Sequence, residues 1–387
     1  MDYELTEEHQ ALVEAVRDFT REVVAPVSAT HDREHSFPYD VVAQMGEMGL
    51  FGLPFPEEHG GQGGDCFALC LALEELAKVD QSVAITLEAG VSLGAMPIHR
   101  YGTEEQKATW LPRLTSGQNL AGFGLTEAEA GSDAGGTRTK AVLEDGQWVI
   151  DGTKEFITNS GTDISSLVTV TAVTGESRRE DGSVKKEIST ILVPTDTAGF
   201  TAEPAYDKVG WNASDTHPLT LNGVRVPEEN LLGERGRGYA NFLGILDEGR
   251  IAIAALAVGA AQGCVDESIR YAKEREAFGA AIGKNQAISF KIARMQARAH
   301  TARLAYYDAA AKMLAGEPFK TEAAIAKVVA GEAAMDNSRD AAQVFGGYGF
   351  INEFVVSRHY RDSKILEVGE GTTEVQLMLI ARSLGLD

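Results

Sequence analysis

The segment KAVLEDGQWVIDGTKEFITN, residues 140–159, decides the fold because the hydrophobic pattern of the chain changes there from helical to β. It contains two Asp-Gly pairs, Asp145-Gly146 and Asp151-Gly152, flanked by β-rich stretches, which is a strong signal for β-hairpins. Further along, LVTVTAVT and ISTILVP have the pattern of strands, and Asn222-Gly223 is predicted to join HPLTL to VRVP. Strands that follow one another through short turns predict a small antiparallel β domain.

Helical patterns lie on both sides of this β region. Before it, Leu12, Val16 and Phe19 line one helix face, and Thr103 with Gln106 can form a capping box. After Tyr239, alanine-rich helices of more than twenty residues indicate an antiparallel bundle. We therefore expect a mainly α protein with a central β domain: an N-terminal helical domain over residues 1–118, a middle antiparallel β domain over 119–233 and a C-terminal four-helix bundle over 234–387.

Composition excludes several classes of function. The chain has 387 residues, and 57 acidic against 35 basic residues give a formal charge of -22, which repels nucleic acid and anionic membranes. Three cysteines without histidine at ligand spacing predict free thiols, a reducing compartment and no metal site. The acidic start and the short apolar runs show no secretory signal, transit peptide or membrane span, so we expect a cytoplasmic protein.

Motifs for common catalytic chemistries are missing from the sequence. It contains no GxxxxGK[ST], no GxGxxG after a strand and no GxSxG, which argues against nucleotide-binding folds of those types and against classical serine hydrolases. Residues 122–136, GFGLTEAEAGSDAGG, combine small residues, hydroxyls and carboxylates suited to holding polar groups, although a surface turn would look the same. Near the C-terminus, GEGTTEVQ places Glu370 between two glycines, either as a turn before a capped helix or because backbone must approach a ligand there.

Seven motifs together resemble one family over essentially the whole chain. TEAEAGSD, KEFITN, DEGRIAIAALAVG, REAFGAAIGKNQAI, QVFGGYGF, RHYRDSKI and GEGTTEVQ occur in the order and at the separations found in acyl-CoA dehydrogenases, especially short-chain and branched-chain members. The resemblance implies an FAD enzyme of fatty acid β-oxidation that introduces an α,β double bond into an acyl-CoA thioester and passes electrons to an electron-transferring flavoprotein. It also implies a homo-oligomer, usually a tetramer, in which subunits share FAD contacts.

The resemblance also assigns roles to individual residues. Glu370 matches the family's base, which removes the α proton, while its N–H and a flavin ribityl hydroxyl bind the thioester carbonyl and hydride passes from the β carbon to flavin N5. The implied FAD contacts are Phe123, Leu125, Thr126, Ser132, Phe156, Ile157, Thr158, Thr372 and Glu374, with Arg275, Phe278, Gln286, Gln343 and Gly347 reaching the FAD of a neighbouring subunit. The implied substrate contacts are Ser132, Asp247, Arg250, Gly369 and Gly371.

Two departures from the common family pattern matter, at Gly369 and in residues 208–218. Gly369 stands where many relatives have tyrosine, which leads to the hypothesis that the enzyme accepts a branched or bulky acyl group. Gly249 stands where some branched-chain relatives carry their base, so the base remains Glu370. Trp211 and His217 replace common arginines, where we expect effects on surface or oligomer contacts. Two rival functions remain: a flavin oxidase or monooxygenase of the same fold that uses O₂, and a non-catalytic acyl-CoA-binding scaffold.

Overall fold

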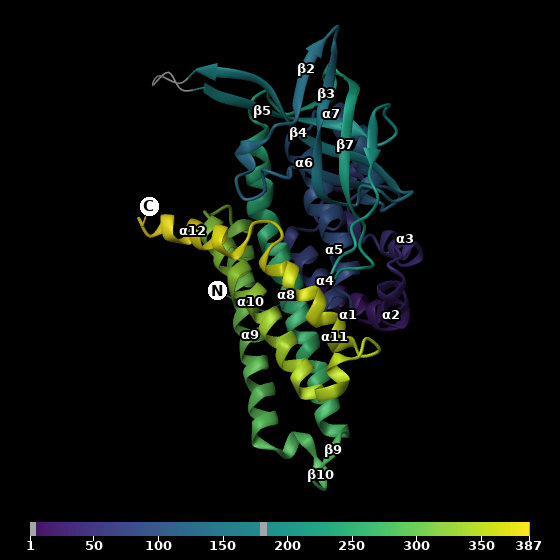
Figure 1. Cartoon of the computed structure of the whole chain (residues 1–387), viewed down its shortest axis with the longest axis vertical. Helices are drawn as coiled ribbons and strands as arrows, with labels where there is room; N and C mark the ends of the chain where they lie inside the picture. Colours follow the sequence, from purple (N-terminus) through teal and green to yellow (C-terminus); the bar gives the residue numbers. More distant parts are fainter. Residues whose placement is uncertain (1–4, 179–183, 387) are drawn as a thin grey trace.

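The computed structural model describes residues 5–178 and 184–386, and it consists of a helical region, a β sheet and a second helical region in that order along the chain (Figure 1). The helical, β and helical order predicted from the sequence is confirmed. The sheet lies at one end of the molecule and the long C-terminal helices extend away from it (Figure 1). Among the helices of these residues, none is both long and apolar enough to cross a bilayer.

The N-terminal region is a cluster of short helices. The predicted capping box is present, because the Gln106 N–H donates to Oγ1 of Thr103 and the Gln106 side chain accepts from the Thr103 N–H. Two π-helical segments continue regular helices: residues 20–24 follow the first helix, and residues 89–95 follow the fifth. The α-helices are α1 (Glu7–Phe19), α2 (Ala25–Glu34), α3 (Tyr39–Glu47), α4 (Cys66–Ala77), α5 (Gln81–Glu88), α6 (Met96–Tyr101) and α7 (Glu104–Thr115).

The middle region forms one sheet with the strand order β6-β7-β3-β2-β4-β5-β8, and β1 pairs with β4 from outside this path. Most neighbours are antiparallel as predicted, but β1 and β2 each pair with β4 in parallel. The strands are β1 (Leu120–Gly124), β2 (Lys140–Glu144), β3 (Gln147–Thr158), β4 (Ser165–Arg178), β5 (Val184–Pro194), β6 (Phe200–Ala202), β7 (Thr216–Pro227) and β8 (Leu231–Leu232).

Only one of the three predicted hairpin turns is a turn. Asp145-Gly146 joins β2 to β3 with both residues at positive φ, as a two-residue hairpin requires. The predictions for Asp151-Gly152 and Asn222-Gly223 are wrong, since the first pair lies inside β3 and the second inside β7. The two pairs lie opposite each other at a register shift, where the Gly223 N–H donates to Asp151 at 2.8 Å. Glycine therefore permits a bulge here instead of a chain reversal.

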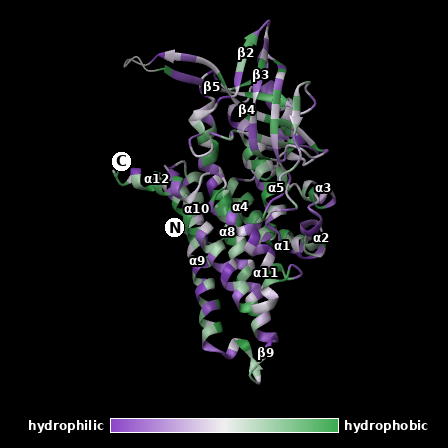
Figure 2. Ribbon diagram, viewed as in Figure 1, coloured by the Kyte–Doolittle hydropathy of each residue, from purple (hydrophilic) through white to green (hydrophobic). Residues whose placement is uncertain are grey.

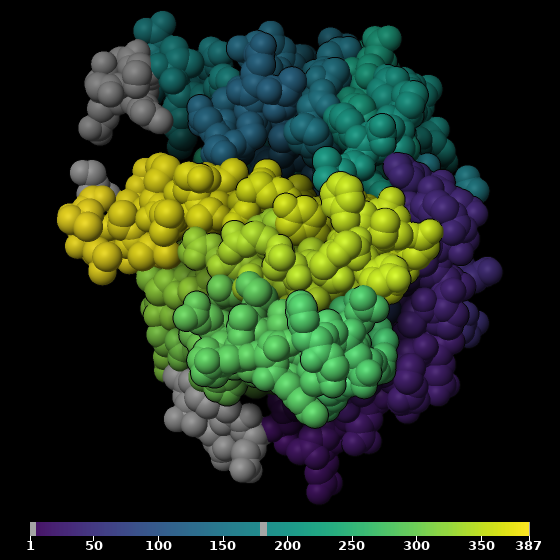
Figure 3. Space-filling model, turned by 60° about the horizontal axis from the view of Figure 1, so that its bottom comes forward, coloured from purple at the N-terminus to yellow at the C-terminus, as the bar shows by residue number. Residues whose placement is uncertain are grey.

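The C-terminal region is built on three long helices. They are α8 (Gly238–Glu274), α9 (Gln286–Leu314) and α10 (Lys320–Phe345), and they pack against one another, with the small hairpin β9 (Glu276–Ala277) and β10 (Ala280–Ala281) at the far end. The shorter α11 (Val355–Asp362) and α12 (Thr373–Ser383) pack on α10. In Figure 3 the C-terminal segment, in yellow, lies between the β region and the rest of the bundle.

The core runs along α8, which is buried on all sides in its middle. Every residue from Ile251 to Ala261 is buried, which is the pattern of a helix surrounded by protein. Its glycines allow α4 to approach closely, since a Cβ at Gly259 would lie 2.3 Å from the carbonyl oxygen of Glu74. Hydrophobic residues gather where α4, α8 and α10 come together (Figure 2). As a result, the first turns of α8 lie between the sheet and both helical regions.

Candidate active site

Glu370 lies in the short loop that precedes α12, in a backbone conformation that side chains rarely adopt. Its φ is +53°, in the left-handed region, and the φ of Gly371 is +97°. A Cβ at position 371 would lie 2.6 Å from the side-chain Nε2 of Gln376, and together with the positive φ this favours glycine there. Thr372 caps α12 by accepting from the Val375 N–H at 3.3 Å. The helix cap and the ligand-approach interpretations of this stretch are therefore compatible, and strain of this kind is common at functional sites.

Two side chains hold the Glu370 loop in place. Lys327 of α10 is 1% exposed, and its Nζ donates to the carbonyl oxygen of Gly371 at 2.6 Å, where the Gln376 side chain also donates at 3.0 Å. Burial lowers the pKa of Lys327 to about 8, although the negative charge of Glu370 opposes the shift. No motif in the sequence marks Lys327. The available signal was a lysine in an alanine-rich stretch of helix whose neighbours are small and apolar.

The Glu370 carboxylate points into the protein toward α8. Both of its oxygens are shielded from solvent and find no hydrogen-bond donor among the described residues, although the residue as a whole is partly exposed. A Cβ at Gly249 would lie 2.6 Å from Oε2 of Glu370, so the missing side chain at Gly249 leaves room for this carboxylate. Burial raises the pKa of Glu370, and a contact with Glu88 and the positive charges of Lys327 and Arg250 oppose the shift. A shielded carboxylate with a raised pKa can act as a base.

Glu88, the last residue of α5, also lies close to the space left by the missing side chain of Gly249. It is fully buried, and its Oε1 lies 3.8 Å from the position a Cβ at Gly249 would have. Burial, followed by the negative charge of Glu370, raises the pKa of Glu88 well above its ordinary value. When Glu88 holds the proton, it can donate to Glu370, so the two carboxyl groups titrate as a pair. The sequence analysis assigned no role to Glu88, because no local motif marks it.

Arg250 and Asp247, the predicted substrate contacts on α8, form an ion pair with each other across one helical turn. Arg250 is 4% exposed, and Lys320 approaches the other oxygen of Asp247 at 3.4 Å. The Nε of Arg250 finds no partner within the described chain. The ion pair of Arg250 and Asp247 therefore leaves the buried Nε–H of Arg250 available as a donor at the edge of the site.

The predicted cofactor residues of the middle region come together at the ends of β1 and β3. The Glu155 N–H donates to the carbonyl oxygen of Thr126 at 2.9 Å, which ties the segment after β1, including Leu125, Thr126 and Ser132, to the segment Phe156–Thr158. Phe123 stacks on Phe242 of α8 with ring centroids 3.8 Å apart, and Ile157 is 2% exposed, so both side chains belong to the core.

The buried ion pair of Lys154 and Glu127 connects the two predicted cofactor segments. Nζ of Lys154 donates to Glu127 at 2.8 Å, and the carboxylate of Glu127 accepts from the backbone N–H groups of Arg138 and Thr139. These contacts fix both predicted cofactor segments to each other. The sequence analysis did not single out this pair.

Phe156 gives the clearest indication of what this surface binds. It is 64% exposed and has φ of +62°, so a large apolar ring is held outside the core by a strained backbone at the end of β3. Exposed or half-exposed hydroxyls of Thr126, Ser132 and Thr158 lie on the same two segments. An aromatic face next to hydroxyl and backbone groups fits the isoalloxazine ring system of a flavin. The residues present therefore fit FAD. Within the described ranges, no cluster of residues is arranged to hold a metal ion.

Thr372 and Glu374 lie at the start of α12, but the other five predicted cofactor residues lie at the opposite end of the bundle, near β9 and β10 (Figure 1). Arg275, Phe278 and Gly347 line a cavity of about 700 Å³, and Gln286 and Gln343 are exposed at the adjoining helix ends. Arg275 follows Gly249 by 26 residues along α8, which corresponds to about 39 Å of helix. The structure therefore does not bring these five residues to Glu370 within one chain.

Trp211 and His217 make their contacts within the chain. The Trp211 N–H donates to Asp362 of α11 at 2.7 Å, and its indole N–H donates to Gln81 of α5 at 3.3 Å. His217 is bonded to Asp215 and to the carbonyl oxygen of Glu203, both at 2.6 Å. Within the chain, Trp211 links the sheet region to both helical regions, and its effect on surface or oligomer contacts stays a prediction.

Comparisons with known proteins agree with this arrangement. The family models of the acyl-CoA dehydrogenase N-terminal, middle and C-terminal domains match residues 6–118, 122–224 and 236–385. The chain is 48% identical to the probable acyl-CoA dehydrogenase YngJ of Bacillus subtilis, over 99% of this chain and 100% of the relative. It is 41% identical to the short-chain specific acyl-CoA dehydrogenase of Megasphaera elsdenii, over 99% and 100%.

A solved structure gives the same result for the fold. The chain superposes with a TM-score of 0.95 and 38% identity, over 100% of both chains, on a chain in a structure described as the electron-transferring flavoprotein of Acidaminococcus fermentans, studied for flavin-based electron bifurcation. The similarity thus extends over all three regions of the protein. We conclude that this chain belongs to the acyl-CoA dehydrogenase family, whose members are FAD-dependent oxidoreductases.

Proposed function

We propose that Glu370 is the base that removes the α proton of an acyl-CoA thioester, giving the trans-2-enoyl-CoA product. The observation that carries this proposal is the position of its carboxylate, which is shielded from solvent, without a hydrogen-bond donor in the described chain, and next to the space left by Gly249. An α proton beside a thioester is only weakly acidic, so a desolvated carboxylate with a raised pKa is suited to remove it.

In this proposal the backbone around Glu370 also binds the thioester. Gly369 and Gly371 carry no side chains, so a thioester can approach the loop closely. The N–H of Glu370 then donates to the thioester carbonyl oxygen and stabilises the negative charge that develops there. Lys327 and Gln376 keep the loop in position by binding the carbonyl oxygen of Gly371. When bound, FAD accepts the hydride that leaves the β carbon.

We propose that Thr126, Ser132, Phe156 and Thr158 contact the FAD, together with backbone groups of Phe123, Leu125 and Ile157 and with Thr372 and Glu374 at the start of α12. Arg250 and Asp247 contact the substrate, as does Ser132. The Arg250 Nε that lacks a partner within the described residues is suited to an oxygen of the CoA part. These assignments rest on the family motifs and on the positions described above.

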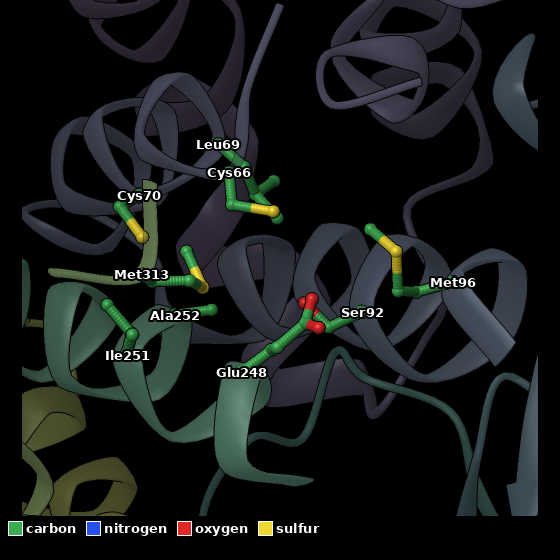
Figure 4. A pocket seen from close by; sticks show the side chains of 9 residues that line it. All are labelled: Cys66, Leu69, Cys70, Ser92, Met96, Glu248, Ile251, Ala252 and Met313. Atoms are coloured by element: carbon green, nitrogen blue, oxygen red, sulfur yellow. The ribbon is translucent and has the colours of Figure 1, made fainter. Parts of the chain in front are cut away.

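The acyl group that fits this site is short. Ser92, one turn beyond Glu88, lines a small cavity with side chains of α4, α6, α8 and α9 (Figure 4). The cavity has a volume of about 20 Å³, room for about one water molecule and too little for several further carbon atoms. An acyl chain that reached this point would have to displace Met96 or Met313 to continue. The name of the Megasphaera elsdenii relative, a short-chain specific enzyme, supports the same proposal.

We also propose that Gly369 allows a branched acyl group. A Cβ at this position would have its nearest contact at 3.4 Å, with the carbonyl oxygen of Ile365, so the structure has room for a side chain that the sequence omits. The omitted volume lies next to the base, where a branch near the α or β carbon would be placed. Because the small cavity lined by Ser92 limits the length of the acyl group, only short branches fit.

Two interactions with other chains complete the proposal. The five residues around the 700 Å³ cavity bind the FAD of a second copy of this chain, so the active form is a homo-oligomer, with a tetramer as the expected size. Phe278 and Phe350, fully and 91% exposed at this end of the bundle, support an interface there. An electron-transferring flavoprotein is the proposed electron acceptor, in line with the description of the similar Acidaminococcus fermentans structure.

The test is an anaerobic reaction of the FAD-bound protein with a panel of short straight and branched acyl-CoAs, followed by flavin absorbance. Wild type should lose the absorbance of oxidised flavin, and Glu370→Gln should retain FAD but slow the reaction by about 10⁴-fold. Equal rates for the two proteins would show that Glu370 is not the base. Rapid O₂ consumption with substrate would favour an oxidase, and a protein that does not bind FAD would favour the scaffold function.

A further inference from the structure

Glu88 is a buried carboxyl group that the proposed mechanism does not use. Neither of its oxygens accepts a hydrogen bond of good geometry in the part of the chain that the structure describes, although burial and the Glu370 carboxyl raise its pKa and the nearby Ser92 hydroxyl lowers it. Two other buried carboxylates are satisfied: Glu74 accepts from Tyr306 at 2.6 Å and pairs with Arg303 at 2.7 Å, and Glu127 pairs with Lys154. Burying a polar group without a partner costs free energy, so such a group in a ligand site indicates a partner supplied by the ligand.

The position of Glu88 places it beside the reacting carbons of the proposed substrate. Glu370 Oε2 and Glu88 Oε1 lie 2.6 Å and 3.8 Å from the point where a Cβ of Gly249 would be. Ser92, one turn beyond Glu88 on the same continuous helix, lines the small cavity proposed above as the end of the acyl site. Glu88 therefore lies between the base and the end of the acyl site, where it faces the first carbons of a short chain.

Resting on the proposed function, we propose that Glu88 is a specificity-determining residue that hydrogen-bonds a hydroxyl group on the acyl chain. The preferred substrates are then short acyl-CoA thioesters with a hydroxyl on the γ carbon or on a branch at the α carbon. Without substrate, the carboxyl group of Glu370 is the acidic neighbour of Glu88, and a protonated Glu88 can donate to it. A bound hydroxyacyl group replaces this contact, because Glu370 faces the α proton and Glu88 faces the hydroxyl.

A hydroxyl suits this site better than a charged amine. It both donates and accepts, so it can bind Glu88 whether or not the carboxyl group is protonated. An ammonium group only donates, and its desolvation in this enclosed site costs more. Two positively charged side chains, Lys327 and Arg250, already influence the pair through Glu370. A neutral donor therefore completes the site without a further charge.

The test compares acyl-CoAs in which a methyl group replaces the hydroxyl. The pairs are 4-hydroxybutyryl-CoA against pentanoyl-CoA, and 3-hydroxy-2-methylpropionyl-CoA against 2-methylbutyryl-CoA, with kcat/KM measured on the FAD-bound enzyme. Wild type should prefer the hydroxylated member of at least one pair by tenfold or more. Glu88→Leu should lose that preference, while Glu88→Gln should keep most of it, since its amide oxygen still accepts.

A stability measurement shows that the Leu variant is folded. Glu88→Leu removes a buried group without a partner in the described chain, so its Tm should equal or exceed that of wild type. The control Glu74→Leu leaves Arg303 and Tyr306 without their acceptor and should lower Tm.

The outcomes separate this proposal from the proposed function. If wild type reduces its flavin with all four thioesters but prefers neither hydroxylated compound, the role of Glu88 is refuted and the dehydrogenase function stands. The same holds if Glu88→Leu keeps a tenfold preference. If no acyl-CoA of this set or of the wider panel reduces the flavin, the proposed function itself is wrong and the role of Glu88 falls with it.

Discussion

Gly249 and Glu370 are complementary: the carboxylate of Glu370 lies where a side chain at position 249 would begin, 2.6 Å from the Cβ that glycine lacks. One residue comes from the buried helix α8 and the other from the loop before α12. The absence of a side chain on the helix therefore determines where the carboxylate of the loop can lie. Because positions 249 and 370 meet at this point, a carboxylate on α8 at position 249 or on the loop at position 370 could reach the same α carbon of the substrate.

Gly249→Ala should reduce kcat by about 10- to 100-fold, because the added methyl group displaces the Glu370 carboxylate by an ångström or more. FAD content should be unchanged, since the atoms nearest to a methyl group at position 249 belong to Glu370 and Glu88. Gly244→Ala on the same helix is the control. Its Cβ meets only the flexible end of Tyr101, at 3.1 Å. An unchanged kcat in Gly249→Ala would show that this contact does not position the carboxylate.

Lys327→Met should shift the pH dependence of kcat/KM. The positive charge of Lys327 lowers the pKa of Glu370, so removing it raises that pKa further. Because the deprotonated form of Glu370 is the base, the acid limb of the profile should move to higher pH, and activity near pH 6 should fall several-fold and recover as the pH rises. Lys320→Met, a more exposed lysine at the start of the same helix, should leave the limb in place. A uniform loss of activity at every pH would indicate a purely structural role.

Gly369→Tyr should change the preference between branched and straight acyl groups. The Cβ contacts at this position begin at 3.4 Å and the φ of Gly369 is not positive, so tyrosine can be introduced without backbone strain. The ring would fill the space next to the base, and kcat/KM for 2-methylpropionyl-CoA should fall at least tenfold relative to butyryl-CoA. Gly369→Ala, the control, should behave like wild type. The hypothesis fails if wild type itself prefers straight chains over every branched one by tenfold.

Asp362→Asn should stabilise the protein at pH 8 more than at pH 5. Burial raises the pKa of Asp362 to about 7, from an ordinary value of 3.8. The folded protein therefore binds a proton that the unfolded chain releases, and stability is lost as the pH rises from about 4 to about 7, by about 4 kcal/mol on an order-of-magnitude scale. Asparagine is neutral at all pH values and keeps the acceptor for the Trp211 N–H.

The measurement is the difference in Tm between Asp362→Asn and wild type at pH 5 and at pH 8. Asp340→Asn is the matched control, because Lys291 and Arg298 bind that carboxylate and the hydrogen bond from Arg298 is the largest effect that lowers its pKa against burial. Its folded pKa lies below both test pH values, so its Tm should fall by a similar amount at each. A Tm change in Asp362→Asn that is equal at both pH values would contradict the raised pKa.

Local signals in the sequence were sufficient for several elements of the fold. The capping box of Thr103 and Gln106, the hairpin at Asp145-Gly146 and the cap of α12 at Thr372 each depend on residues within a few positions of one another. The order of helical, β and helical regions followed from the period of the hydrophobic pattern. Similar signals failed at Asp151-Gly152 and Asn222-Gly223, because a glycine that accepts positive φ permits a bulge as readily as a turn, and strand pairing decides between them.

The sequence identified Glu370 and the family through motifs, but the surroundings of the base are a property of the tertiary structure alone. Glu88, Gly249, Lys327 and Glu370 come from α5, α8, α10 and the loop before α12, and nothing in the local sequence relates them. The pKa of a carboxyl group depends on which charges and how much protein surround it, and those distances exist only after the helices pack. The chemical identity of the base was therefore set by the sequence, and its burial and its charged neighbours by the fold.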